Sequence, residues 1–262
     1  MNQTHDYIAV FDSGVGGISV LRHLLRYLPG ERFLYFGDSA NAPYGEKSTE
    51  QVRRLTLQAA EMLFGRGAKA LVVACNTATA AAIDLLRKTY PDKIIVGIEP
   101  ALKLAATQFP TGRIGIMATQ VTLREEKLST LLEHFPAVQT VRISAPGLVK
   151  LIEQGLANAP ETETLLRQAL SPHIGKLDAL VLGCTHYPFV KDTLCRILGS
   201  QTQLFDGSEG TARHTRRLLE QADLLENGEG SVTIENSLGT PESILLSHRL
   251  LTACAGTESV IE

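Results

Sequence analysis

Short apolar runs alternate with amphipathic stretches along this chain. The apolar runs, rich in Val, Ile and Leu, predict strands at Tyr7–Phe11, Phe33–Phe36, Ala70–Ala74, Ile94–Ile98, Arg113–Met117, Thr140–Ile143, Ala179–Gly183 and Gln203–Phe205. Between them, Ser48–Phe64 and Glu161–Leu170 carry apolar residues at helical spacing. This alternation indicates an α/β protein whose parallel sheets are covered by helices.

Parts of this pattern occur twice. Ala-Leu-Val-Val-Ala-Cys at 70–75 matches Ala-Leu-Val-Leu-Gly-Cys at 179–184, and 8–13 resembles 114–119 in the same order. Chance likeness between apolar strands is the alternative, although the paired cysteines favour a repeat. We therefore predict two similar α/β domains. The first comprises 1–98 plus a returning segment, 206–262, with a helix at Gly210–Ala222, and the second comprises 99–205.

Composition narrows the class of protein. Of 262 residues, 44% are hydrophobic and 20% are charged, which is typical of a soluble globular protein. The formal net charge is −3, which does not indicate the basic surface that binds nucleic acid. No apolar run is long enough to span a membrane. The N-terminus lacks the features of a signal peptide, and four scattered cysteines suit a reducing compartment. We expect a cytoplasmic protein without nucleic-acid or membrane partners.

Two cysteines end matching strands. Ligands of parallel sheets bind beyond the carboxyl ends of the strands, where Cys75 and Cys184 stand. Cys75 opens a helix-like run, Asn76–Lys88, and a helix N-terminus favours thiolate, so a small downward shift from a pKa of about 8.5 is expected. Pro188 places the helix after Cys184 a few residues later. A single such cysteine is ordinarily an apolar filler, as we expect of Cys195 and Cys254, but two in matching contexts indicate function.

Polar residues near the two cysteines suggest helpers. His186 follows Cys184 closely and can relay a proton near neutral pH. Asp12 could serve Cys75 in the same way, or it could merely cap the helix expected at Ile18–Tyr27. The intervening turn, DSGVGG at 12–17, brings backbone N–H groups to an anion, and a carboxylate suits it as well as a phosphate. The turn lacks the spacing of a nucleotide-binding loop.

Further candidate donors lie at other strand ends and loops. Asn76-Thr77 and Thr185-His186 combine side-chain donors with an expected helix start. Tyr44, in the loop Asn41–Gly45, could cover a ligand or donate to it, although the segment also fits an ordinary Pro-containing turn.

Taken together, these motifs resemble the glutamate racemases of the aspartate/glutamate racemase superfamily. The matching segments are FDSGVGG (11–17), YFGDSANAPYGEKS (35–48), VVACNTATA (72–80) and VLGCTHYP (181–188). The resemblance implies two α/β domains with an active site between them, and no cofactor or metal. It implies that Cys75 and Cys184 are the acid/base thiols, assisted by Asp12 and His186, with Glu153 as a weaker third candidate. The substrate contacts that it implies are Asp12, Ser13, Pro43, Tyr44, Gly45, Asn76, Thr77, Thr119, Thr122, Thr185 and His186.

One segment departs from the family pattern. Thr119 and Thr122 are present, but Val121 stands where the family often has glycine, and the serine and aromatic residue that follow are missing. The residues before Tyr7 are too few for the activator-binding extension of some members, so we expect no regulation of that kind.

The resemblance implies a mechanism with one thiol on each face of the substrate. A single base would have to swing across Cα, whereas two opposed thiols remove and return the proton without large movement. Cys75 would deprotonate D-glutamate and Cys184 L-glutamate, and the product D-glutamate would supply peptidoglycan synthesis. The alternatives are a racemase of aspartate or another amino acid, a metal-binding module using Cys75, Cys184, His186 and Asp12, and a flavodoxin-like cofactor binder. We expect a homodimer, the commonest soluble assembly.

Overall fold

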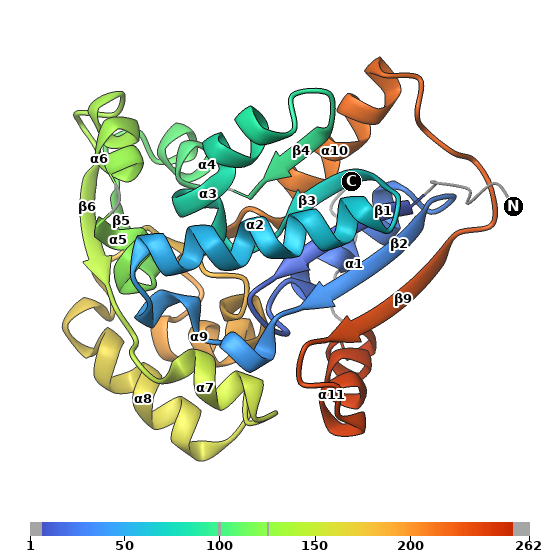
Figure 1. Ribbon diagram of the computed structural model, residues 1–262. Coiled ribbons are helices and arrows are strands. Elements are labelled where there is room, and N and C mark those ends of the chain that lie inside the picture. The colour runs from blue at the N-terminus through green and yellow to red at the C-terminus, as the bar shows by residue number, and fades with distance from the viewer. Residues whose placement is uncertain (1–6, 99–100, 125, 254–262) are drawn as a thin grey trace, which may run out of the picture.

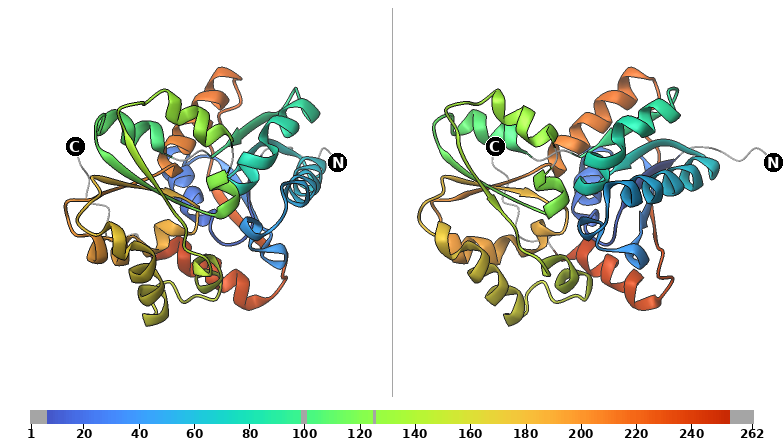
Figure 2. Two further views of the ribbon diagram at one scale, coloured as in Figure 1. Left: turned by 90° about the vertical axis from the view of Figure 1, so that its left-hand side faces the viewer. Right: turned by 60° about the vertical axis from the view of Figure 1, so that its left-hand side comes forward.

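The computed structural model describes residues 7–98, 101–124 and 126–253 and contains two parallel sheets. The first sheet has the order β4-β3-β1-β2-β9, with bounds Ile94–Gly97, Ala68–Val73, Tyr7–Asp12, Arg32–Gly37 and Ser231–Asn236. The second has the order β6-β5-β7-β8, with bounds Gln139–Ile143, Arg113–Ala118, Ala179–Gly183 and Gln203–Asp206. Figure 2 shows the two sheets side by side, each with helices packed against it.

Helices cover both faces of the first sheet. Successive side chains of β1 point to opposite faces, so Ala9 and Phe11 belong to one buried cluster, and Ile8 and Val10 to another. The first cluster is completed by α2 (Thr49–Gly65) and α3 (Asn76–Thr89), which lie in front of the strands in Figure 1. The second is completed by α1 (Ile18–Tyr27) and α10 (Ser208–Gln221). Because helices cover both faces of the sheet, side chains on both sides of a buried strand are apolar, and the strand sequences are continuous apolar runs.

The second sheet is built in the same way. One face packs against α7 (Leu148–Glu153), α8 (Pro160–Leu170) and α9 (Lys191–Leu198). The other packs against α4 (Leu102–Gln108) and residues from α5 (Gln120–Arg124) and α6 (Glu126–Glu133). The last helix, α11 (Pro241–Thr252), packs against α1, and its Leu250 contacts the cores of both sheets.

The structure confirms the predicted fold class, two α/β units with parallel sheets flanked by helices. All eight predicted strands form, within two residues of the predicted ends. The sequence analysis missed β9 at the edge of the first sheet, and α11 after it. The domain bounds of 1–98 with 206–262, and of 99–205, stay a prediction. No helix among the described residues has the length and apolar character needed to cross a membrane.

Candidate active site

Cys75 lies at the junction of β3 and α3, where it is the N-cap residue of the helix. Its Sγ accepts a hydrogen bond from Ala78 N at 3.4 Å and donates one to the Ser13 hydroxyl at 3.4 Å. Burial raises the pKa of the Cys75 thiol to about 12, the Asp12 charge adds to the rise, and the two hydrogen bonds only partly offset it. The expected downward shift is therefore wrong for this thiol, because loss of solvent outweighs the helix N-terminus.

Cys184 lies at the corresponding end of β7, but its surroundings differ. The chain continues into a short 3-10 turn, Tyr187–Val190, and α9 begins only at Lys191, as Pro188 predicted. Cys184 is thus not a helix N-cap. Its Sγ instead lies 3.7 Å from Nδ1 of His186, and both side chains are buried.

His186 joins Cys184 to Glu153, the last residue of α7. The distance between His186 Nε2 and Glu153 Oε1 is 2.5 Å. Burial alone lowers the pKa of His186, but the contacts with Cys184 and Glu153 outweigh it and hold this pKa well above its usual range. Burial likewise favours a protonated Glu153, yet His186 and the other hydrogen-bond donors hold the Glu153 pKa below its usual range. Both shifts favour the form of the pair in which His186 is an imidazolium and Glu153 a carboxylate.

The glycine-rich turn after β1 does bind an anion, and that anion is Glu153. The backbone N–H of Val15 donates to Glu153 Oε1 at 2.7 Å. A Cβ on Gly14 would lie 1.9 Å from Glu153 Oε1, and one on Gly16 would lie 2.4 Å from His186 Nδ1. The glycines therefore allow the second half of the molecule to approach the first.

Asp12 is the last residue of β1, and it is buried where the first sheet faces Thr185, which follows β7 of the second sheet. Its carboxylate accepts hydrogen bonds from Gly14 N and from the Thr185 hydroxyl, both at 2.9 Å. Burial raises the pKa of Asp12, and the His186 charge opposes the rise. Asp12 does not cap the next helix, since the N-cap of α1 is Gly17, without a side-chain bond. The alternative reading of Asp12 as a helix cap is therefore wrong.

Three threonine hydroxyls meet across the cleft between the sheets. Thr119 Oγ1 lies 3.1 Å from the hydroxyls of both Thr77 and Thr122, and Thr77 and Thr122 are 3.5 Å apart. Val121 lies in α5 and lines the outer cavity, so the departure from the family pattern leaves both threonines facing Thr77.

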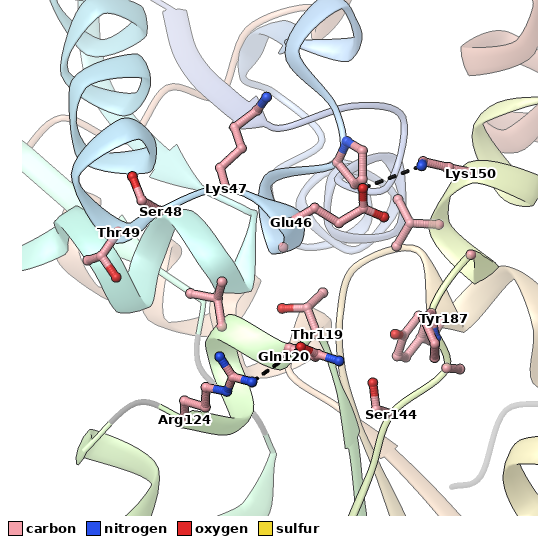
Figure 3. Close-up of a pocket in the computed structure, with 17 residues that line it drawn as sticks. Glu46, Lys47, Ser48, Thr49, Thr119, Gln120, Arg124, Ser144, Lys150 and Tyr187 are labelled. Carbon is pink, nitrogen blue, oxygen red and sulfur yellow. Dashed lines mark hydrogen bonds and ion pairs between the residues drawn. The ribbon is translucent and has the colours of Figure 1, made fainter.

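These side chains surround an inner cavity of about 10 Å³, which opens toward an outer one of about 700 Å³. The inner cavity is lined by Ser13, Pro43, Tyr44, Gly45, Cys75, Asn76, Thr77, Thr119, Val149, Cys184, Thr185 and His186. All of the predicted substrate contacts except Asp12 and Thr122 are part of this lining. The Tyr44 hydroxyl donates to Asp38 Oδ2 at 2.7 Å and is therefore already used within the protein. Figure 3 shows the outer cavity, where Glu46 and Lys150 pair across the cleft at 3.4 Å.

The model of the Asp/Glu/Hydantoin racemase family matches residues 8–215. This chain belongs to that family. It is 45% identical over 255 residues to the glutamate racemase of Clostridium botulinum strain Alaska E43, covering 96% of this chain and 99% of the relative. Among solved structures it resembles the glutamate racemase of Thermus thermophilus in complex with β-chloro-D-alanine, with 38% identity, a TM-score of 0.79 and coverage of 94% and 93%.

A second solved relative bears on the ligand of the family. The glutamate racemase of Francisella tularensis, in complex with D-glutamate, is 26% identical with a TM-score of 0.82 and covers 94% of each chain. These relatives confirm the resemblance drawn from the motifs and the assignment as an isomerase of the glutamate racemase type. Within the described residues, no cluster of three His, Cys, Asp or Glu side chains has the arrangement of a metal site.

The sequence analysis missed Val149 in the cavity wall and gave Glu153 little weight. Val149 and Glu153 lie on α7, a short helix that follows Gly147 at a φ of +89°. The approach of this helix to the glycine turn has no local sequence signal, because it depends on a contact between residues 138 positions apart.

Proposed function

We propose that this protein interconverts L- and D-glutamate by proton transfer between substrate Cα and two thiols, without a cofactor. The observation that carries the proposal is that Cys75 and Cys184 line one small cavity from different sheets. Two acid/base groups on opposite sides of a carbon can invert it without moving across it. The relatives named above share this family and carry the name glutamate racemase.

In the direction from L- to D-glutamate, Cys184 takes the α-proton and Cys75 returns one to the other face. The raised pKa of Cys75 suits this direction, since the resting thiol is protonated and ready to donate. Next to Cys184, the His186 imidazolium provides positive charge and a proton donor at 3.7 Å. In the reverse direction the roles exchange, and Cys75 has to start as the thiolate.

Uncharged donors would hold the substrate. The lining of the inner cavity, among the residues that the structure describes, contains no Lys or Arg, so hydroxyl and backbone N–H groups would bind the substrate carboxylates. The serine and threonine hydroxyls of this lining are those of Ser13, Thr77, Thr119 and Thr185. Asn76 Oδ1 is buried and has no hydrogen-bond partner among the described residues, which leaves it to accept from the substrate ammonium. Fixed donors in a dry cleft stabilise the charge that develops at Cα.

Glutamate entry requires the cleft to widen. An inner cavity of about 10 Å³ has room for about one water molecule and not for an amino acid. The outer cavity of about 700 Å³ adjoins it and shares Pro43, Gly45, Thr119 and Val149 with it, so it is the natural entrance. Separation of the two sheets would open the inner cavity toward this entrance.

The product of the proposed reaction, D-glutamate, would supply peptidoglycan synthesis. The alternative on the same scaffold is racemisation of aspartate or another amino acid, since the chemistry at Cα is shared. The close matches to glutamate racemases favour glutamate. A homodimer, the commonest soluble assembly, stays a prediction.

Proton exchange in heavy water tests the proposal directly. Purified protein is incubated with D-glutamate in D₂O and chelator without added cofactor, and the α-proton signal is followed by NMR. We expect the signal to vanish while L-glutamate forms, as seen by polarimetry. Exchange with aspartate but not glutamate would change the substrate, and exchange with neither would overturn the proposed reaction.

A further inference from the structure

Ser39 connects Glu153 to a distant part of the chain. It begins the short turn Ser39–Asn41 that follows β2. Its hydroxyl donates to Glu153 Oε2 at 2.8 Å and accepts from Asn236 Nδ2 at 2.9 Å. Asn236 is the last residue of β9, the edge strand of the first sheet, and is buried. The returning C-terminal segment therefore reaches the cleft through this residue.

The hydrogen bonds from Asn236 through Ser39 to Glu153 form a network in which each donor has a fixed direction. Leu238 N donates to Asn236 Oδ1 at 3.0 Å, which turns the amide nitrogen of Asn236 toward Ser39. A serine hydroxyl has a single proton, and because Asn236 donates to its oxygen, that proton is directed at Glu153. The same hydrogen-bond network continues from Glu153 through His186 to Cys184. Aligned donors of this kind reinforce one another.

We propose that Ser39 and Asn236 form a positioning pair for Cys184. They hold the Glu153 carboxylate in the orientation that pairs it with His186, and so control proton transfer at Cys184 but not at Cys75. This inference rests on the proposed function. It gives β9, an element beyond the two cysteine-bearing repeats, a specific part in the reaction.

Geometry explains why Glu153 needs such a pair. Its Oε1 accepts from both Val15 N and His186 Nε2, so the carboxylate can turn about its own axis unless Oε2 is also held. Ser39 holds Oε2, the oxygen that His186 does not contact. Among the described residues, the hydrogen bonds of Cys75 go to Ser13 and Ala78 N and not to this network. Loss of Ser39 should therefore weaken one thiol selectively.

The test compares Ser39→Ala with Ser237→Ala. Ser237 is the matched control, because its hydroxyl accepts from Ala40 N at 2.9 Å at the same junction but outside the chain to Glu153. Racemisation of L- and D-glutamate, each with hydrogen or deuterium at Cα, gives kcat, KM and the isotope effect for each enantiomer. The deuterium of L-glutamate moves to Cys184, and that of D-glutamate moves to Cys75.

For Ser39→Ala we expect kcat to fall about tenfold or more, the size of one lost hydrogen bond to a charged group, with KM little changed. The isotope effect should rise for L-glutamate and fall for D-glutamate, because the step at Cys184 becomes slower in both directions. Asn236→Ala should give the same asymmetry with a fall of about threefold, as expected for a neutral hydrogen bond. Ser237→Ala should leave kcat and both isotope effects unchanged.

The proposal is overturned if Ser39→Ala behaves like Ser237→Ala, or if it slows both enantiomers with isotope effects that change alike. Should Ser39→Ala fail to fold by circular dichroism, Asn236→Ala decides the question by the same asymmetry. An unsubstituted protein that does not racemise glutamate would overturn the proposed function itself, and the inference with it.

Discussion

Cys75 and Cys184 occupy equivalent places in the repeat but have unlike neighbours. Cys75 caps α3 and contacts a serine hydroxyl and a backbone N–H. Cys184 precedes a 3-10 turn and contacts His186, which is paired with Glu153. The repeat therefore supplies two thiols at the ends of two strands, while the chemistry around each comes from elements that are not repeated.

This difference suits two unlike tasks. Burial and the Asp12 charge keep Cys75 protonated, as an acid needs to be at rest. Cys184 has a titratable partner whose own pKa is raised by contacts with Cys184 and Glu153. L- and D-glutamate are enantiomers with the same free energy in water, so kcat/KM has to be equal in both directions, but the two bases need not be equal.

Replacing either thiol should have the largest effect. Cys75→Ser and Cys184→Ser each remove one of the two proposed acid/base groups, so we expect racemisation to fall at least about 10³-fold to 10⁴-fold. Polarimetry with each enantiomer measures the loss. Cys195→Ser, at an exposed position in α9, is the matched control and should retain full activity. Substantial turnover by either single variant would contradict the two-thiol mechanism.

Removing the charge of Glu153 should act mainly through His186, the residue beside Cys184. In Glu153→Gln the carboxylate no longer raises the pKa of His186, so the imidazolium is lost at a lower pH. We expect kcat near pH 8 to fall about 100-fold and the alkaline limb of the kcat–pH profile to move toward acid.

The control for this change is Glu163→Gln, which removes an exposed carboxylate of α8 that pairs with Arg167. Its profile should match that of the unsubstituted protein. An unchanged alkaline limb in Glu153→Gln would separate Glu153 from the chemistry of His186.

Stability in alkali should report on Cys75. The folded thiol titrates at a pKa of about 12 and the unfolded one near 9, so above pH 9 the folded state binds more protons. Stability is then lost as pH rises, by at most about 1.4 kcal/mol per pH unit for one group. Cys75→Ser has no thiol to titrate, so its unfolding free energy in urea should fall less steeply between pH 9 and 10. If the unfolding free energies of Cys75→Ser and of the unsubstituted protein fell equally with pH, the raised pKa of Cys75 would be contradicted.

Signals at strand ends explain how much of this site could be predicted. Cys75, Asn76, Cys184 and His186 follow apolar runs directly, and parallel sheets bring such ends together. The glycines at 14 and 16 were also visible as an anion-binding turn. Their partner was not, because nothing in the local sequence shows that Glu153 approaches from 138 residues away.

The missed features share a physical cause. In β9, polar and apolar residues alternate at a sheet edge, unlike the continuous apolar runs of the buried strands, so it lacked the pattern used to find the others. Asn236 is an ordinary polar residue whose role exists only through contacts between distant segments. The pKa of Cys75 was misjudged because the helix N-terminus is a local feature, whereas burial depends on the whole fold.

The smallest effect should come from the cleft entrance, which favours neither thiol. Glu46 and Lys150 pair across it at 3.4 Å, but both side chains are more than half exposed, so the pair should contribute at most about 1 kcal/mol. Lys150→Met should change KM no more than about threefold, and equally for both enantiomers, with unaltered isotope effects. A double-mutant cycle with Glu46→Gln measures the coupling. An isotope effect that changed for one enantiomer would mean that the entrance is linked to a particular thiol, and the asymmetry would then extend beyond His186 and Glu153.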